Sequence, residues 1–120
     1  MEMAGIRIKS IVYPTKSVAA ATRFYGEVLG LPVQFQDGDN WAQFRPDGGT
    51  LALAGPREQP PEAAGPVVTL EVADLDALRP RLAGAGVRVV AERDMGSHGR
   101  TLTIADPDGN LVHLFQRAAG

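Results

Sequence analysis

Two histidines and one tryptophan are the residues of this chain whose types suggest chemistry or ligand binding. His113 lies in an apolar run, Leu111-Val112-His113-Leu114-Phe115. It has two interpretations. One is a satisfied, partly buried histidine, and the other is a polar group in a ligand pocket or a metal-free general acid or base. A single histidine without an obvious titratable partner gives little support for catalysis, so both interpretations stay open.

Trp41 belongs either to a strand core or to an aromatic wall on which a planar ligand stacks. Gln43 shares its strand face and would then offer an amide. Leu111 and Phe115 share the His113 face and predict an apolar floor, as small-molecule sites usually have. His98 and Arg100 belong either to solvated surface or to a cavity rim that binds an anionic group.

Composition excludes several classes of function. Cysteine is absent, which rules out disulfides, thiolate metal sites and a cysteine nucleophile. A net charge of −2 gives no electrostatic footprint for nucleic acid or an anionic membrane. The sequence contains no run of about 18 apolar residues and no signal-peptide layout, so we expect a cytoplasmic protein without nucleic-acid or membrane partners.

The first half predicts a helix over 18–29 between strands. Ser17 is a good N-cap, and Gly30 is a natural terminator. Apolar residues recur at helical spacing between them, at Ala21, Phe24, Tyr25, Val28 and Leu29. The predicted strands are 6–13, 31–36, 41–45 and 50–54.

The second half repeats this order. Asp74 caps a predicted helix over 75–85, in which Pro80 predicts a kink or a short helix. The predicted strands are 66–73, 87–92, 100–105 and 111–116, and a glycine-containing loop covers 93–99.

The halves match in order, spacing and turn chemistry. Arg45-Pro46-Asp47-Gly48 and Asp106-Pro107-Asp108-Gly109-Asn110 are both Pro-Asp-Gly turns that lead into an apolar strand. We therefore expect one domain, 1–120, with an internal repeat of modules 6–55 and 66–117. The proline-rich linker 56–65 should be extended and fairly stiff.

Two motifs make the chain resemble the vicinal oxygen chelate superfamily, the glyoxalase, bleomycin-resistance protein and extradiol dioxygenase group. They are Phe24-Tyr25-Gly26-Glu27-Val28-Leu29-Gly30-Leu31 and Asp106-Pro107-Asp108-Gly109-Asn110. The resemblance covers essentially the whole chain. It implies an α+β fold of two βαβββ modules that form a cupped, partly open barrel. It also implies a homodimer, with ligand cavities that often lie between subunits.

The resemblance further implies four positions at which metal-dependent members carry ligands. These positions are Ser10, Ala52, Val67 and His113, so only one of them holds a good ligand. His98, Glu71 or Glu92 would have to complete an unusual site. Ser10 is better explained as a small cavity-lining residue than as a nucleophile, because no base is predicted beside it.

We expect no metal or cofactor. The favoured function is metal-independent binding of an aromatic or amphipathic small molecule, as in drug or metabolite sequestration. The alternatives are a lyase, isomerase or dioxygenase with an atypical or His113-centred site, and a non-catalytic regulatory module. The candidate ligand-binding residues are Ser10, Trp41, Gln43, Ala52, Val67, Thr69, Leu111, His113 and Phe115.

Overall fold

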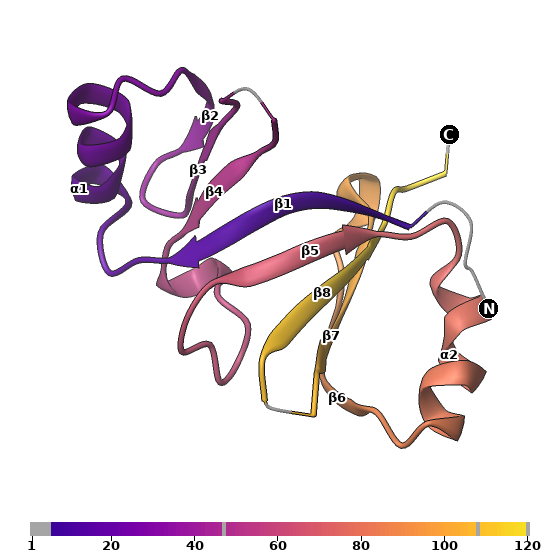
Figure 1. The fold of residues 1–120 in the computed structure, drawn as a ribbon. Helices are drawn as coiled ribbons and strands as arrows, with labels where there is room; N and C mark the ends of the chain where they lie inside the picture. Colours follow the sequence, from indigo (N-terminus) through magenta and orange to yellow (C-terminus); the bar gives the residue numbers. More distant parts are fainter. Residues whose placement is uncertain (1–5, 47, 108, 120) are drawn as a thin grey trace. The chain divides into compact units, whose positions relative to one another are not determined.

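The computed structural model describes residues 6–46, 48–107 and 109–119. Its elements form an α+β fold in which the order strand, helix, three strands occurs twice, as predicted (Figure 1). The chain divides into two compact units. The first unit is Ser10–Val67, and the second unit comprises Met1–Lys9 and Val68–Gly120. No helix in the described part of the chain is long and apolar enough to cross a membrane.

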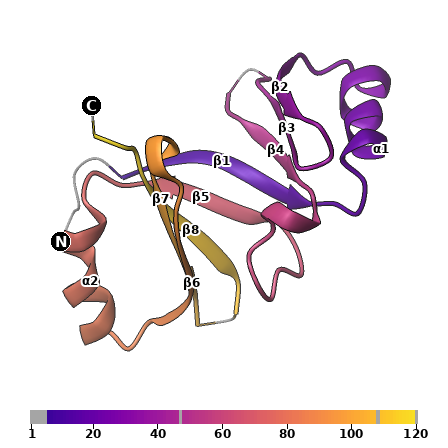
Figure 2. The same cartoon turned by 180° about the vertical axis from the view of Figure 1, so that it is seen from behind.

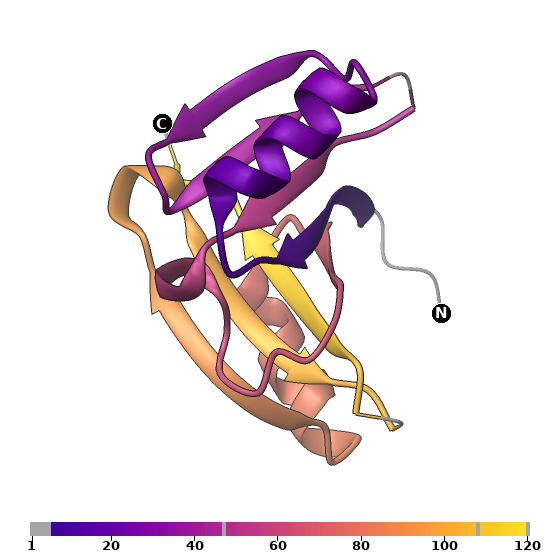
Figure 3. The ribbon, with the colours of Figure 1, turned by 90° about the vertical axis from the view of Figure 1, so that its left-hand side faces the viewer.

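The first unit contains four strands in the order β2-β3-β4-β1. Their bounds are β1 (Arg7–Pro14), β2 (Val33–Asp37), β3 (Trp41–Phe44) and β4 (Leu51–Ala54). β1 runs parallel to β4, whereas β2-β3 and β3-β4 are antiparallel pairs. The helical segment lies across one face of these strands (Figure 3), and the core between them is built on Val18, Phe44 and Leu53.

The prediction of one continuous α-helix over 18–29 is wrong in its second half. Ser17 caps α1 (Val18–Thr22) as expected, because its side chain accepts a hydrogen bond from the Ala20 amide. The backbone then widens into a π-helical segment, η1 (Arg23–Val28). The wider turn breaks the 3.6-residue period. Tyr25 therefore packs on the core, while Val28 is 69% exposed.

The segment predicted as an extended linker is held against the first unit. It begins with a short 3-10 turn, η2 (Pro56–Glu58). The Gln59 side chain then donates hydrogen bonds to the carbonyls of Thr15 and Ala54. These bonds satisfy backbone acceptors next to the ends of β1 and β4, so the segment is anchored at that point.

The second unit contains the sheet β5-β8-β7-β6, with α2 on one face (Figure 2). The bounds are β5 (Val67–Glu71), α2 (Leu75–Gly84), β6 (Arg88–Asp94), η3 (Gly96–His98), β7 (Arg100–Ala105) and β8 (Leu111–Gln116). Asp74 caps α2 as predicted, and Leu75 and Leu78 pack on Leu102 and Leu114. α2 continues for four residues beyond Pro80.

Candidate functional site

The face of the second unit's sheet that is opposite α2 brings together several predicted site residues. Side chains alternate along a strand, so the residues that pack on α2 leave their neighbours on the other face. The register pairs Thr69 of β5 with His113 of β8, and His113 with Thr103 of β7. Thr69 and Thr103 are buried, and His113 is partly buried between them. Leu111 and Phe115 flank His113 on the same strand face.

The imidazole of His113 is fixed by one hydroxyl group. Its Nδ1 lies 2.8 Å from the Thr103 Oγ1. Burial of the ring lowers the pKa of His113 to about 4, and the positive charge of Arg93 adds to this effect. Because that pKa lies well below neutrality, the ring is uncharged at pH 7. His113 therefore offers a neutral polar group between two threonines, with Leu111 and Phe115 beside it on its own strand.

A second row of side chains crosses the same face beside His113. The register places Glu71, Phe115, Thr101 and Arg93 next to one another on β5, β8, β7 and β6. The Lys9 Nζ lies over the Phe115 ring, 5.3 Å from its centroid. Glu71 forms ion pairs with Arg7 at 3.2 Å and with Arg117 at 3.1 Å. This face therefore combines an aromatic ring with several cations.

The remaining predicted site residues lie in the first unit or at the start of β5. The register of β1, β4 and β3 places Ser10, Ala52 and Gln43 on the sheet face opposite α1. Ser10 and Ala52 are buried, and so is Val67 at the start of β5. Trp41 Nε1 donates to Gln43 Oε1 at 3.1 Å, and Gln43 Nε2 donates to Gln34 Oε1 at 2.9 Å. The Gln43 amide thus orients the Trp41 indole.

The residues at the expected metal positions do not fit a divalent cation. A catalytic site needs about three protein ligands, and Ala52 and Val67 have no donor atom. Ser10 offers only a hydroxyl, which is a poor metal ligand, so His113 is the one good ligand among the four positions. Of the other acids considered, Glu71 pairs with two arginines and Glu92 with Arg79. Within the described residues, no group of three or more His, Cys, Asp or Glu could hold a metal ion.

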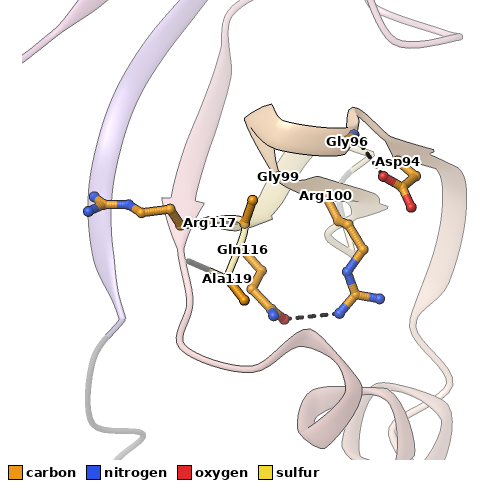
Figure 4. Close-up of a pocket in the computed structure, with 8 residues that line it drawn as sticks. Asp94, Gly96, Gly99, Arg100, Gln116, Arg117 and Ala119 are labelled. Atoms are coloured by element: carbon orange, nitrogen blue, oxygen red, sulfur yellow. Dashed lines mark hydrogen bonds between the residues drawn. The ribbon is translucent and has the colours of Figure 1, made fainter.

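A depression of about 280 Å³ lies where β7 begins and β8 ends (Figure 4). Arg100 and Arg117 line it together with Asp94 and Gln116. Arg100 donates to Gln116 at 3.1 Å and pairs with Asp76 at 3.3 Å, while Arg117 pairs with Glu71. Arg100 lines this depression, and its role as a cavity rim that binds an anionic group stays a prediction. Its guanidinium is committed to neighbouring side chains.

Sequence reasoning missed Thr103, Lys9 and Arg93. Thr103 was open to prediction because the turn between β7 and β8 pairs Ala105 with Leu111, and this pairing places Thr103 opposite His113. Lys9 and Arg93 gave no such indication. Their places beside Phe115 and His113 depend on contacts between segments that are distant in the sequence.

Comparison with known proteins assigns the family. A sequence model of the Glyoxalase/Bleomycin resistance protein/Dioxygenase superfamily matches residues 7–114, so the chain belongs to this superfamily. An uncharacterized protein of Mycolicibacterium smegmatis (strain ATCC 700084 / mc(2)155) is 32% identical over 116 residues, covering 94% of this chain and 96% of the relative.

Two crystal structures illustrate the shared fold. A glyoxalase/bleomycin resistance protein/dioxygenase superfamily member from Vibrio splendidus 12B01 has a TM-score of 0.70 at 21% identity, over 92% of this chain and 98% of that one. Methylmalonyl-CoA epimerase from Mycobacterium tuberculosis has a TM-score of 0.68 at 22% identity, over 93% and 88%. Proteins with this fold typically bind small-molecule ligands and often form dimers.

Proposed function

We propose that this protein is a metal-independent small-molecule binding protein of the cytoplasm, which sequesters an aromatic or amphipathic drug or metabolite. The observation that carries the proposal is the residue set at the family's metal positions. Ser10, Ala52 and Val67 cannot replace the missing ligands, which leaves His113 as the one good ligand among the four positions. A neutral imidazole with Leu111 and Phe115 on the same strand face suits capture of a ligand by burial with few polar contacts.

The neutral state of His113 argues for binding over turnover. A general base works best when its pKa lies near the working pH, whereas the pKa of His113 is lowered to about 4. The lyase, isomerase or dioxygenase alternative would need a stronger base than this imidazole. A regulatory module without a ligand would show no binding that depends on Trp41, whereas the proposal predicts that the ligand stacks on its indole.

The first experiment combines metal analysis with ligand binding. The dialysed, untagged protein is assayed for Zn, Ni, Mn, Fe and Co by mass spectrometry. It is then titrated in EDTA with N-phenyl-1-naphthylamine, an uncharged aromatic probe. We expect no stoichiometric metal and saturable binding that weakens in His113→Ala, and Trp41→Ala tests separately whether a ligand stacks on the indole. Tight binding of one metal per chain that His113→Ala abolishes would overturn the proposal, and so would no saturable probe binding.

We also propose a homodimer formed through the first unit. Large apolar side chains are exposed on η1 and on β2, an edge strand of its sheet. These side chains are Phe24, Val28, Leu29, Val33 and Phe35. A second copy is the natural occupant because this fold often forms dimers and exposed apolar patches of this kind mark interfaces.

Light scattering after size-exclusion chromatography tests the dimer. Val28→Glu should shift the protein towards the monomer, because it places a charge within the patch. Ala19→Glu, at an exposed position of α1, adds the same charge outside the patch and should keep the dimer. A wild-type monomer at all concentrations, or two variants with equal masses, would contradict this interface.

A further inference from the structure

We propose that the ligand carries an anionic group, which binds beside Phe115 between Lys9 and Arg93. This inference rests on the proposed binding function and names the chemical class of its ligand. The class is an aromatic or apolar body that bears a carboxylate, sulfonate or phosphate. Charged side chains lie near Phe115 on the sheet face opposite α2 in the second unit.

Basic side chains and one acidic side chain of the described residues take part in the contacts of this face. Arg7, Lys9, Arg93 and Arg117 contribute four positive charges, whereas Glu71 contributes one negative charge. Both carboxylate oxygens of Glu71 are engaged, Oε1 by Arg7 and Oε2 by Arg117. The acid is therefore already compensated by two arginines, and Lys9 is the cation that lies over the Phe115 ring.

Lys9 is the cation best placed to receive an anion. Its ammonium lies over the Phe115 ring, and no carboxylate among the described residues forms an ion pair with it. Lys9 is partly buried, and its ammonium has three hydrogen-bond donors. The face of the Phe115 ring satisfies the positive charge only in part. A ligand anion at this point would meet the ammonium while its apolar body lies against Phe115.

Arg93 bounds the same site from the other side. Arg93 on β6 pairs with Thr101 on β7, which pairs with Phe115 on β8. The backbones of Arg93 and Phe115 are therefore two strands apart, about 10 Å at the usual strand spacing. The charge of Arg93 reaches His113, because it lowers the pKa of that ring. A guanidinium has five donors in a planar fork, so it can serve a ligand oxygen in addition to a protein partner.

The test uses two probes with the same anilinonaphthalene body. 8-Anilinonaphthalene-1-sulfonate carries a sulfonate, and N-phenyl-1-naphthylamine is uncharged. We expect the sulfonate probe to bind about tenfold more tightly, which is the lower range for a charge-assisted contact. Raising the ionic strength should reduce this preference, because part of the site is exposed.

Matched variants assign the preference to Lys9. Lys9→Met keeps a flexible apolar stem on Phe115 and removes the charge, so the affinity ratio of the two probes should fall at least about threefold. Lys9→Arg should retain the ratio. Lys16→Met removes the same charge from an exposed position in the first unit and should also retain it.

The outcomes separate this inference from the proposed function. Equal affinity for both probes, or a ratio that Lys9→Met leaves unchanged, would overturn the anionic ligand class while metal-independent binding stands. Saturable binding of neither probe would overturn both proposals. A ratio lowered equally by Lys9→Met and Lys16→Met would also overturn the inference, because it would reflect net charge alone.

Discussion

His113 and Thr103 face each other across β8 and β7, with the imidazole Nδ1 2.8 Å from the threonine hydroxyl. The threonine is buried, and the ring is held neutral by burial and by Arg93. One of the four positions expected to carry a metal ligand thus holds a histidine that is hydrogen-bonded through Nδ1 within its own sheet. Two predictions concern this pair directly.

The first prediction is a loss of stability on acidification. Below about pH 6.5 the unfolded state binds a proton that native His113, with its pKa of about 4, still excludes. The native state therefore loses stability as the pH falls, by up to about 3 kcal/mol near pH 4, and this effect is absent above about pH 7. Urea unfolding of wild type and His113→Gln across this range measures it. The two proteins should differ in pH dependence, and parallel curves would contradict the lowered pKa.

The second prediction concerns the energy of the His113–Thr103 contact. Thr103→Val removes the hydroxyl and leaves a partly buried ring nitrogen without its partner, so it should cost about 1–3 kcal/mol of unfolding free energy. In a His113→Leu background the same change should cost about 1 kcal/mol less. Denaturant unfolding of the four proteins gives this coupling energy. Thr101→Val is the control on the same face and should show no coupling, and additivity in the Thr103 cycle would refute the contact.

The third prediction concerns two glycines around η3. Gly99 has φ +102, and a Cβ there would overlap the Gln116 carbonyl and lie 2.8 Å from the Phe115 ring. Gly96 has φ +60, and its Cβ would meet nothing within 4 Å. Gly99→Ala should therefore destabilise the protein by more than about 2 kcal/mol, and Gly96→Ala by about 1 kcal/mol. Thermal unfolding ranks the two variants, and equal losses would count against this close approach.

Gly99→Ala should also disturb ligand binding, because the new methyl group displaces the ring of Phe115. Titration with N-phenyl-1-naphthylamine should show a weaker affinity for Gly99→Ala than for Gly96→Ala at a temperature where both are folded.

The fourth prediction concerns the turn between β7 and β8. The Asp106 carboxylate accepts hydrogen bonds from the Asn110 backbone amide at 2.8 Å and from its side chain at 3.0 Å. Asp106→Ala should cost about 1–2 kcal/mol, because both donors lose a charged acceptor. Asp106→Asn keeps an acceptor oxygen and should lose less. Urea midpoints of the two variants test this, and equal destabilisation would show that the turn does not depend on these bonds.

Local chemistry made much of the fold predictable. Strands β7 and β8 have the predicted bounds. The turn chemistry between them fixes where β7 ends and where β8 begins. Ser17 and Asp74 cap their helices because each side chain reaches an amide three residues on. The change from α1 to η1 was not predictable from periodicity, since Phe24, Val28 and Leu29 imitate a core stripe and are exposed. Residue 47 and residue 108, in the two Pro-Asp-Gly turns, lie outside the described residues. The internal repeat stays a prediction.

The site was predictable only in part. Strand alternation grouped Leu111, His113 and Phe115, and the register adds Thr69 as a neighbour. Lys9 on β1 and Arg93 on β6 are the cations on the Phe115 face. Both strands are distant from β8 in the sequence, so spacing did not predict that these residues lie near it. Pairing of Gln43 with Trp41 and Gln34 depends on side-chain geometry that spacing does not fix.

The division of β1 between the two units has a consequence for the order of folding during synthesis. The first unit is one continuous segment, Ser10–Val67, whereas the second unit needs the residues up to Lys9 as well as the last strand. Arg7 emerges from the ribosome early, and it can form its ion pair only after Glu71, 64 positions later, has emerged as well. We therefore expect the first unit to fold on the nascent chain and the second only near release, because distant contacts delay folding. Protease protection of arrested nascent chains would detect this order, and simultaneous protection of both units would exclude it.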